Sequence, residues 1–148
     1  MTSIAHVMTG AFIASKLPHP LLYIPLAIGI HYLEDWTPHW DFGTGLSTGR
    51  RSKKTALFLG ILDLIAGLSL VYWLWQLPAT DVQYHIWLGA IAGIVPDLLE
   101  SPRNFLKWEP AFVTRLNDFH ESVHVSIPYI GLGLLPQLVV VGLILLLR

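Results

Sequence analysis

The sequence predicts an all-α integral membrane protein: a single transmembrane helical domain over residues 1–148, with about five transmembrane or re-entrant helices. Hydrophobic residues make up 53% of the chain. Charged residues make up only 13%, whereas about 25% is usual in soluble proteins. Two apolar stretches also reach the roughly 20 residues that span the core of a bilayer.

The two clearest spanning helices lie in the middle and at the end of the chain. We predict them over Thr55–Leu77 and Ser126–Leu147, because both stretches are almost uninterrupted apolar sequence. A third span is predicted over Val82–Glu100, where Gly89 and Gly93 remove the side-chain bulk that keeps helices apart.

Two shorter apolar segments precede these spans. Ile4–Leu17 and Leu21–Leu33 predict either two tilted spans or one re-entrant hairpin. Both alternatives return the chain to the side from which it entered. Helical geometry is not expected at Thr37, since Pro38 disfavours it at the preceding residue.

Cationic residues predict the orientation, because Lys and Arg accumulate in cytoplasmic loops. Most of the cationic residues fall in loops on one predicted side of the membrane: Arg50, Arg51, Lys53, Lys54, Arg103, Lys107 and Arg115. Only Lys16 and Arg148 fall on the other side. We therefore expect a cytoplasmic N-terminus and an outside C-terminus, in the inner (plasma) membrane of a bacterium. The first helix lacks a preceding basic region, so a cleaved signal peptide is not expected.

Composition excludes several classes of function. The net charge of −1 and the pI near 6.6 leave no basic face for phosphates, so nucleic acid is not an expected partner. The chain has no cysteine, which excludes disulfides, thiolate ligands and cysteine nucleophiles. The expected partners are membrane lipids, a lipid-like substrate, and either further copies of the chain or a larger membrane complex.

Histidines and carboxylates gather at the predicted cytoplasmic boundary. The stretch "HYLEDWTPHWD" places His31 and Asp35 four residues apart, on one face of a helix, with His39 just beyond. The stretch "FHESVH" repeats that spacing with His120 and His124. Imidazole and carboxylate together form a ligand set for zinc, or alternatively for manganese or iron.

Neighbouring residues complete the candidate site. His6, in the first predicted helix, is either a further ligand or an interior histidine. Three carboxylates, Asp97, Glu100 and Glu121, are expected to act as general base or to orient the ligands. The predicted cofactor is a divalent metal, with Zn²⁺ favoured, and its candidate ligands are His6, His31, Asp35, His39, His120 and His124.

Three other residues carry separate expectations. Trp36 and Trp40 are predicted to anchor the chain at the inner interface of the membrane. Asp63 lies in the middle of a predicted span, where a carboxylate normally faces the bundle interior and has a partner. We leave open whether Asp63 is protonated and structural or belongs to a polar path.

The motifs "GIHYLEDWTPHWDF", "GAIAGIVPDLLE" and "FHESVH" resemble the small membrane-bound metal-dependent hydrolases of the YdjM type. The resemblance covers most of the chain and implies a helical membrane protein with metal-dependent hydrolase activity. It implies these polar site residues: His6, His31, Asp35, Asp97, His120 and His124. One motif departs from the family pattern, because Glu121 replaces the Arg that usually follows the first histidine of the pair, and three residues rather than four separate the two histidines.

The function expected is a membrane-embedded metal-dependent hydrolase that acts at the cytoplasmic interface, on a lipid-like ester or phosphoester. One alternative is a non-enzymatic subunit or scaffold of a larger membrane complex, with helix contacts through Gly60, Gly67, Gly89 and Gly93 and a structural metal or polar network. Another is a b-type haem protein with two histidines as axial ligands.

Overall fold

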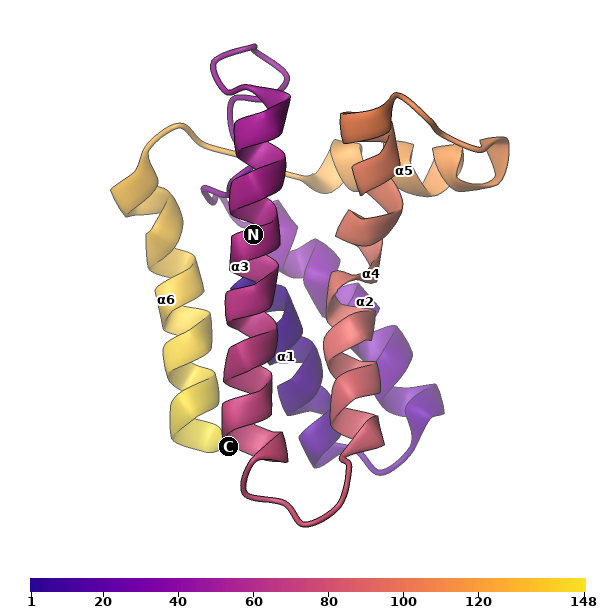
Figure 1. Cartoon of the computed structure of the whole chain (residues 1–148), viewed down its shortest axis with the longest axis vertical. Coiled ribbons are helices and arrows are strands. Elements are labelled where there is room, and N and C mark those ends of the chain that lie inside the picture. Colours follow the sequence, from indigo (N-terminus) through magenta and orange to yellow (C-terminus); the bar gives the residue numbers. More distant parts are fainter.

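A computed structural model describes residues 1–148 as a bundle of helices without strands (Figure 1), which confirms the all-α prediction. The elements are α1 (Ser3–Lys16), α2 (Pro20–Trp36), α3 (Lys53–Val71), the π-helical turn η1 (Tyr72–Gln76), α4 (Tyr84–Leu106), α5 (Ala111–Val123) and α6 (Ile130–Leu147).

Helix α1 is the centre of the bundle, where it contacts α2, α3, α4 and α6. Met1 is buried, so the amino terminus lies among the helices rather than at an end of the bundle (Figure 1). With 14 residues, α1 is about 21 Å long, less than the roughly 30 Å of a bilayer core. A short, surrounded helix of this kind brings its polar residues to the interior of the molecule.

Glycines allow α1 to approach its neighbours closely. A Cβ atom on Gly10 would lie 2.1 Å from the carbonyl oxygen of Gly89, and one on Gly93 would lie 2.2 Å from the carbonyl oxygen of His6. On α3, a Cβ atom on Gly67 would lie 2.6 Å from the side chain of Val7. The close helix contact predicted at Gly89 and Gly93 is therefore confirmed, and it is made within the chain.

Local sequence explains where the helices start and stop. Ser52 caps α3 by accepting the N–H of Thr55 at 3.1 Å. Thr37 is extended, as predicted from Pro38, and ends α2. This ending releases the chain from the helix just before His39.

Helix α5 was not among the predicted helices, because the sequence there resembles a charged loop. It is a short amphipathic helix that buries Val113, Asn117 and His120 along one face. Its polar composition hides it from a search for apolar spans. The helix carries His120 across the end of the bundle towards α2 and α4.

Two helices are long and apolar enough to cross a membrane, Lys53–Gln76 and Ile130–Leu147. Within their most apolar windows, only 22% and 17% of the residues are buried in the molecule. They correspond to the two clearest predicted spans. Helix α4 forms over the third predicted span but is not apolar enough to join them.

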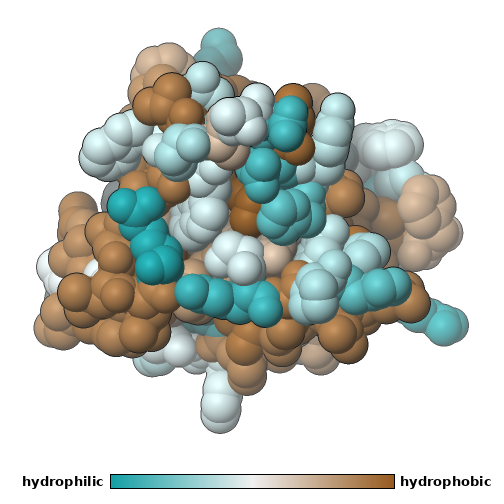
Figure 2. All heavy atoms as spheres, turned by 90° about the horizontal axis from the view of Figure 1, so that it is seen from below, coloured by the Kyte–Doolittle hydropathy of each residue, from teal (hydrophilic) through white to brown (hydrophobic).

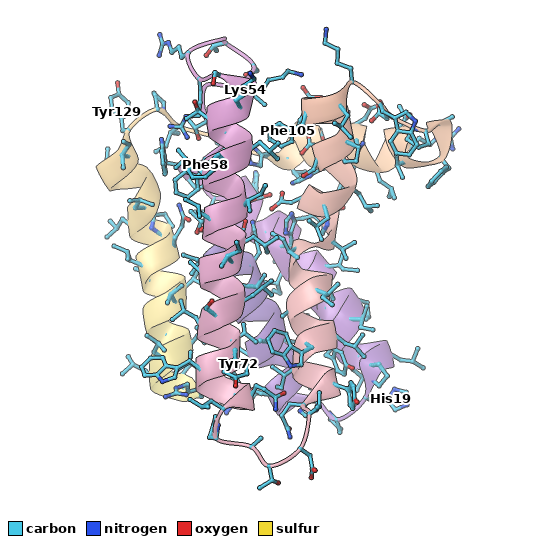
Figure 3. The ribbon with its side chains drawn as sticks, viewed as in Figure 1. His19, Lys54, Phe58, Tyr72, Phe105 and Tyr129 are labelled. Carbon is cyan, nitrogen blue, oxygen red and sulfur yellow. The ribbon has the colours of Figure 1, made fainter.

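The two predicted sides of the membrane correspond to opposite ends of the bundle. Lys54 and Tyr129 lie at one end, and His19 and Tyr72 lie at the other (Figure 3). Viewed from the latter end, the molecule shows pale and hydrophilic residues across the face and hydrophobic residues around its sides (Figure 2).

Of the two tryptophans predicted as anchors, only Trp36 is exposed, at 67%. Trp40 is buried instead, since its ring lies under the guanidinium of Arg51, 5.0 Å from the ring centroid, and packs against Phe42. Trp40 is thus a packing residue of the loop after α2.

Candidate metal centre

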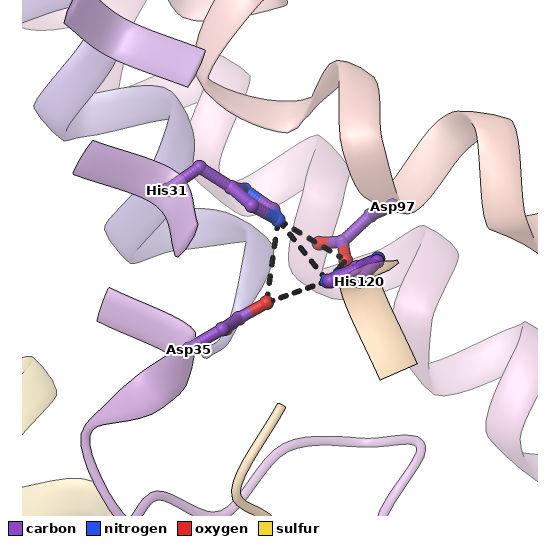
Figure 4. Close-up of side chains that lie close together, drawn as sticks. All are labelled: His31, Asp35, Asp97 and His120. Atoms are coloured by element: carbon purple, nitrogen blue, oxygen red, sulfur yellow. Dashed lines mark hydrogen bonds and ion pairs between the residues drawn. The ribbon is translucent and has the colours of Figure 1, made fainter. Parts of the chain in front are cut away.

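Imidazoles and carboxylates from three helices converge on one buried point (Figure 4). We call His31, Asp35, Asp97 and His120 the first donor group. His31 and Asp35 come from one face of α2, as their spacing predicts, while Asp97 comes from α4 and His120 from α5. Each offers one ligand atom, and these atoms all lie within 4.8 Å of one another.

The distances in the first donor group match those around a small metal ion. The Nε2 atoms of His31 and His120 lie 3.3 Å apart, and Asp35 Oδ2 lies 3.2 and 2.8 Å from them. Asp97 Oδ1 lies 3.8 and 3.7 Å from the same two nitrogens. Ligands about 2.0–2.1 Å from a tetrahedral zinc are about 3.4 Å apart, so the four atoms lie close to that arrangement.

The backbone of α4 orients His31 for binding. The ring donates its Nδ1–H to the carbonyl of Gly93 at 2.7 Å, which leaves the Nε2 lone pair directed at the other donors. Because Gly93 also lies against α1, the same residue sets the helix spacing and the tautomer of the ligand.

His6 borders the first donor group from α1. Its Nδ1 contacts Glu34 Oε2 at 2.7 Å, and its Nε2 lies 3.2 Å from Asp35 Oδ1 and 3.9 Å from Asp97 Oδ2. The amino group of Met1 contacts the same Asp35 oxygen. His6 is therefore a buried residue beside the cluster but belongs to neither donor group, and its role as a ligand stays a prediction.

A second donor group consists of Asp35, His39 and His124. Backbone pairing holds it together, since His39 N–H donates to the carbonyl of Val125 at 3.1 Å and Val125 N–H donates to the carbonyl of Asp35 at 2.8 Å. The Nε2 atoms of His39 and His124 lie 3.2 Å apart. Asp35 belongs to both donor groups.

Neighbouring charged and hydrogen-bonding groups shift the pKa values of two residues outside the apolar helices. Burial of His120 favours the neutral ring, but Asp35 and Glu100 outweigh it and raise the pKa of His120 to about 10. Burial of Asp41 favours the neutral acid, but hydrogen bonds with His124 and His39 outweigh it and lower the pKa of Asp41. Both groups are therefore charged at neutral pH in the metal-free chain.

The three carboxylates predicted as catalytic lie in different surroundings. Asp97 belongs to the first donor group, with its side chain 30% exposed. Glu100 Oε2 lies 3.2 Å from His120 Nδ1, outside hydrogen-bonding geometry. Glu121 is exposed and pairs with Arg103, so the structure does not bring it into the cluster.

Sequence reasoning missed two residues of the site, Glu34 and Asp41. Glu34 is buried against His6 and accepts a hydrogen bond from the hydroxyl of Thr9. Its spacing of three from His31 places it on the same helix face, and this signal was available in the sequence. Asp41 Oδ2 lies 3.0 Å from His39 Nε2 and 3.3 Å from His124 Nε2.

Two buried polar residues in the apolar helices support the site from outside. Asp63 accepts the N–H of Ser3, so a carboxylate of α3 supplies the cap that α1 lacks. Gln137, on α6, accepts the N–H of Thr2 at 2.8 Å and donates to the carbonyl of Trp40 at 2.6 Å. These contacts fix the start of α1 and the loop that carries His39.

The chain was compared with protein-family models, curated proteins and solved structures, and none of the three comparisons found a match.

Proposed function

We propose that the protein is a membrane-embedded metal-dependent hydrolase that acts at the cytoplasmic interface on a lipid-like ester or phosphoester. The observation that carries the proposal is the first donor group, in which two imidazoles and two carboxylates from three helices present four ligand atoms to one point. The comparisons supply no family, so the proposal depends on this chemistry and on the short sequence motifs.

A cation explains the arrangement better than a network of hydrogen bonds alone. His31 donates its Nδ1–H to Gly93, so the Nε2 of a neutral ring carries a lone pair. That lone pair faces an imidazole nitrogen at 3.3 Å and a carboxylate oxygen at 3.2 Å. Three acceptors around one point need either a proton on His120 or a bound metal, and a divalent ion satisfies all of them at once.

When bound, a divalent metal supplies Lewis acidity to polarise the scissile group and to acidify a water. In the hydrolysis, the oxygen of one water joins the carbonyl carbon or the phosphorus, the bond to the alcohol oxygen breaks, and that oxygen gains a proton. Asp97 is the partly exposed carboxylate of the first donor group, and Glu100 lies next to His120. In this proposal, these two residues move the proton or hold the ligands in position.

The exposed surface supports a location in the membrane. A core helix of a water-soluble protein is mostly buried, but α3 and α6 expose most of their apolar windows. Contiguous apolar surface of that extent is unfavourable in water and favourable in lipid. Several large side chains of α6 are more than half exposed: Leu132, Leu135, Leu138, Val139 and Leu146.

An apolar pocket next to the cluster supports a lipid-like substrate. It is an open hollow of about 440 Å³ on the surface of the bundle, lined from α2 and α6 by residues that include Leu33, Leu135 and Val139. Glu34 also lines the pocket, and Glu34 contacts His6 at 2.7 Å. An acyl chain in this pocket would bring its polar end towards the donor cluster.

The test is hydrolysis by the detergent-purified protein after metal removal and after reloading with Zn²⁺ or Mn²⁺. Chromogenic carboxylic esters and phosphoesters of short and long chain length serve as substrates. We expect activity only after reloading, its loss in His31→Ala, and its retention in His85→Ala, because His85 is an exposed residue at the opposite end of the bundle. A wild-type protein that binds metal but hydrolyses none of these substrates would contradict the proposal and favour the scaffold function.

A further inference from the structure

Beyond the first donor group, the loop after α2 and the C-terminal end of α5 present another set of ligand atoms. We propose that Asp35, His39 and His124, with Asp41, bind a second divalent ion, so that Asp35 bridges two ions. This inference rests on the proposed function, because the ion in the first donor group is the one that Asp35 would share.

The geometry of the second set is compact. His39 Nε2, His124 Nε2 and Asp41 Oδ2 form a triangle with sides of 3.2, 3.3 and 3.0 Å. Ligands of one tetrahedral zinc are separated by about 3.4 Å, close to these values. The set thus offers two imidazoles and a carboxylate before Asp35 is counted.

The donors are held in ligand orientation by contacts on their other sides. His39 donates its Nδ1–H to the carbonyl of Thr37 at 2.9 Å, so the Nε2 of a neutral ring carries a lone pair. Asp41 uses Oδ1 to accept the N–H of Thr44 at 2.7 Å, which leaves Oδ2 facing the two histidines. A lone pair directed at a carboxylate oxygen 3.0 Å away calls for either a proton on the ring or a metal ion bound to both atoms.

Asp35 connects this set to the first donor group through its two oxygens. Oδ2 faces His31 and His120, at 3.2 and 2.8 Å. Oδ1 contacts the amino group of Met1 and lies 3.2 Å from His6 Nε2 and 3.7 Å from His39 Nε2, so the second ion would share this oxygen with them. A carboxylate used in this way bridges paired metal ions, which lie about 3.5–4 Å apart in enzymes that act on phosphate and peptide bonds. The side chain is fully buried, so both oxygens depend on cationic or donor partners inside the protein.

The test measures Mn²⁺ bound per chain together with the electron paramagnetic resonance spectrum of the loaded protein. Two ions bridged by one carboxylate are expected to give two Mn²⁺ per chain and a broad, exchange-coupled spectrum. The variant His124→Ala is expected to retain one Mn²⁺ with the hyperfine pattern of an isolated ion. His124 is partly exposed, with 29% of its side chain accessible, so the truncation leaves no large cavity. His85→Ala is the matched control and should match the wild type.

Failure of this inference is distinct from failure of the proposed function. One isolated Mn²⁺ in the wild type, or two that persist in His124→Ala, would overturn the second site and leave the first intact. No bound Mn²⁺ in the wild type would overturn both. If His124→Ala does not elute like the wild type in size-exclusion chromatography, Asp41→Asn keeps the side-chain volume and should show the same loss of one ion.

Discussion

Asp35 is the residue on which the candidate centre depends most, because its two oxygens face different sets of histidines. Oδ2 lies 2.8 Å from His120 Nε2 in the first donor group, and Oδ1 lies 3.7 Å from His39 Nε2 in the second. A substitution that removes its charge therefore affects both donor groups at once, whereas a change at any single histidine affects one.

The variant Asp35→Asn keeps the shape of this side chain and removes its charge. Loss of residues that only orient a metal ligand costs about 10–100-fold in affinity, so we expect a loss of more than about 100-fold for this direct ligand. Isothermal titration with Zn²⁺ measures the change. Asp118→Asn is the control, because Asp118 is exposed and pairs with Arg103; equal losses in the two variants would argue against a specific site.

The pH dependence of metal binding follows from His120. Its pKa is raised to about 10 by Asp35 and Glu100 against the effect of burial. The protonated ring therefore stabilises the metal-free fold, and this stabilisation is complete at pH values below the pKa of the unfolded chain's histidine, near 6.5. That stabilisation is lost as the pH rises towards 10. A metal ion must displace the proton, so affinity should rise with pH over this interval.

Titrations at pH 7.5 in buffers of different ionisation enthalpy measure the protons released when Zn²⁺ binds. We expect about one proton per chain from His120. Binding that releases no protons and keeps the same affinity from pH 6.5 to 9 would contradict this placement of His120.

At the residue scale, the sequence identified most of the cluster because spacing reveals shared helix faces. His31, Asp35, His120 and His124 follow from intervals of four, and the structure brings them together. Asp41 was not proposed as a ligand, since its approach to His124 depends on the parallel pairing of His39 with Ser126, a contact far apart in sequence.

At the scale of elements, the packing of α1 against α4 sets where along the bundle axis the ligand side chains come together. Gly10 and Gly89 bring the two backbones together, and Gly93 both contacts α1 and accepts the hydrogen bond of His31. The interface therefore serves the site as well as the fold.

Gly10→Val tests this packing. The new Cβ would lie 2.1 Å from the carbonyl oxygen of Gly89, a backbone atom that cannot rotate away. We expect a loss of about 1–3 kcal/mol of stability, measured by unfolding in detergent, together with weaker Zn²⁺ binding. Gly60→Ala is the control: nothing lies within 4 Å of its added methyl group, so that change should be neutral or slightly stabilising.

The pocket between α2 and α6 makes a separate prediction about the substrate. Val139→Trp fills part of its volume of about 440 Å³, so hydrolysis of long-chain substrates should fall while that of short-chain substrates persists. Leu146→Trp places the same side chain on an exposed position of α6 and should change neither. If Val139→Trp reduced the hydrolysis of short-chain and long-chain substrates equally, the pocket would not be the binding site of the substrate's acyl chain.

Elements were predicted where long apolar runs mark them, which is why the two clearest predicted spans cover most of α3 and all of α6. Helix α5 lacked that signal, because Ala111–Val123 buries only one narrow face and exposes the rest. Its role is positional, since without α5 the pair His120 and His124 would not reach α2.

At the scale of the whole molecule, the positive loops and the donor cluster belong to the same half of the bundle. The loop before α3 and helix α5 lie at one end, and the turn between η1 and α4 lies at the other (Figure 1). The sequence predicted this division from its lysines and arginines, and the helix arrangement is compatible with it. The path of α1 through the centre was not predictable from apolar length, since its burial arises from neighbours on every side.

Single-cysteine labelling tests the orientation, since the chain has no cysteine of its own. Ser47→Cys and Thr80→Cys place a thiol in exposed loops at opposite ends. With a membrane-impermeant maleimide on intact cells, we expect Thr80→Cys to react and Ser47→Cys to react only after permeabilisation. The reverse pattern would place the donor cluster at the outer interface.

The central claim is that the buried imidazoles and carboxylates bind a metal ion, and the metal content of the detergent-purified protein tests it most directly. We expect at least one equivalent of Zn²⁺, Mn²⁺ or iron per chain in the wild type, and its loss in the double variant His31→Ala, His120→Ala. His85→Ala should keep the wild-type content. A folded wild-type protein without stoichiometric metal, and unable to take it up, would contradict the account.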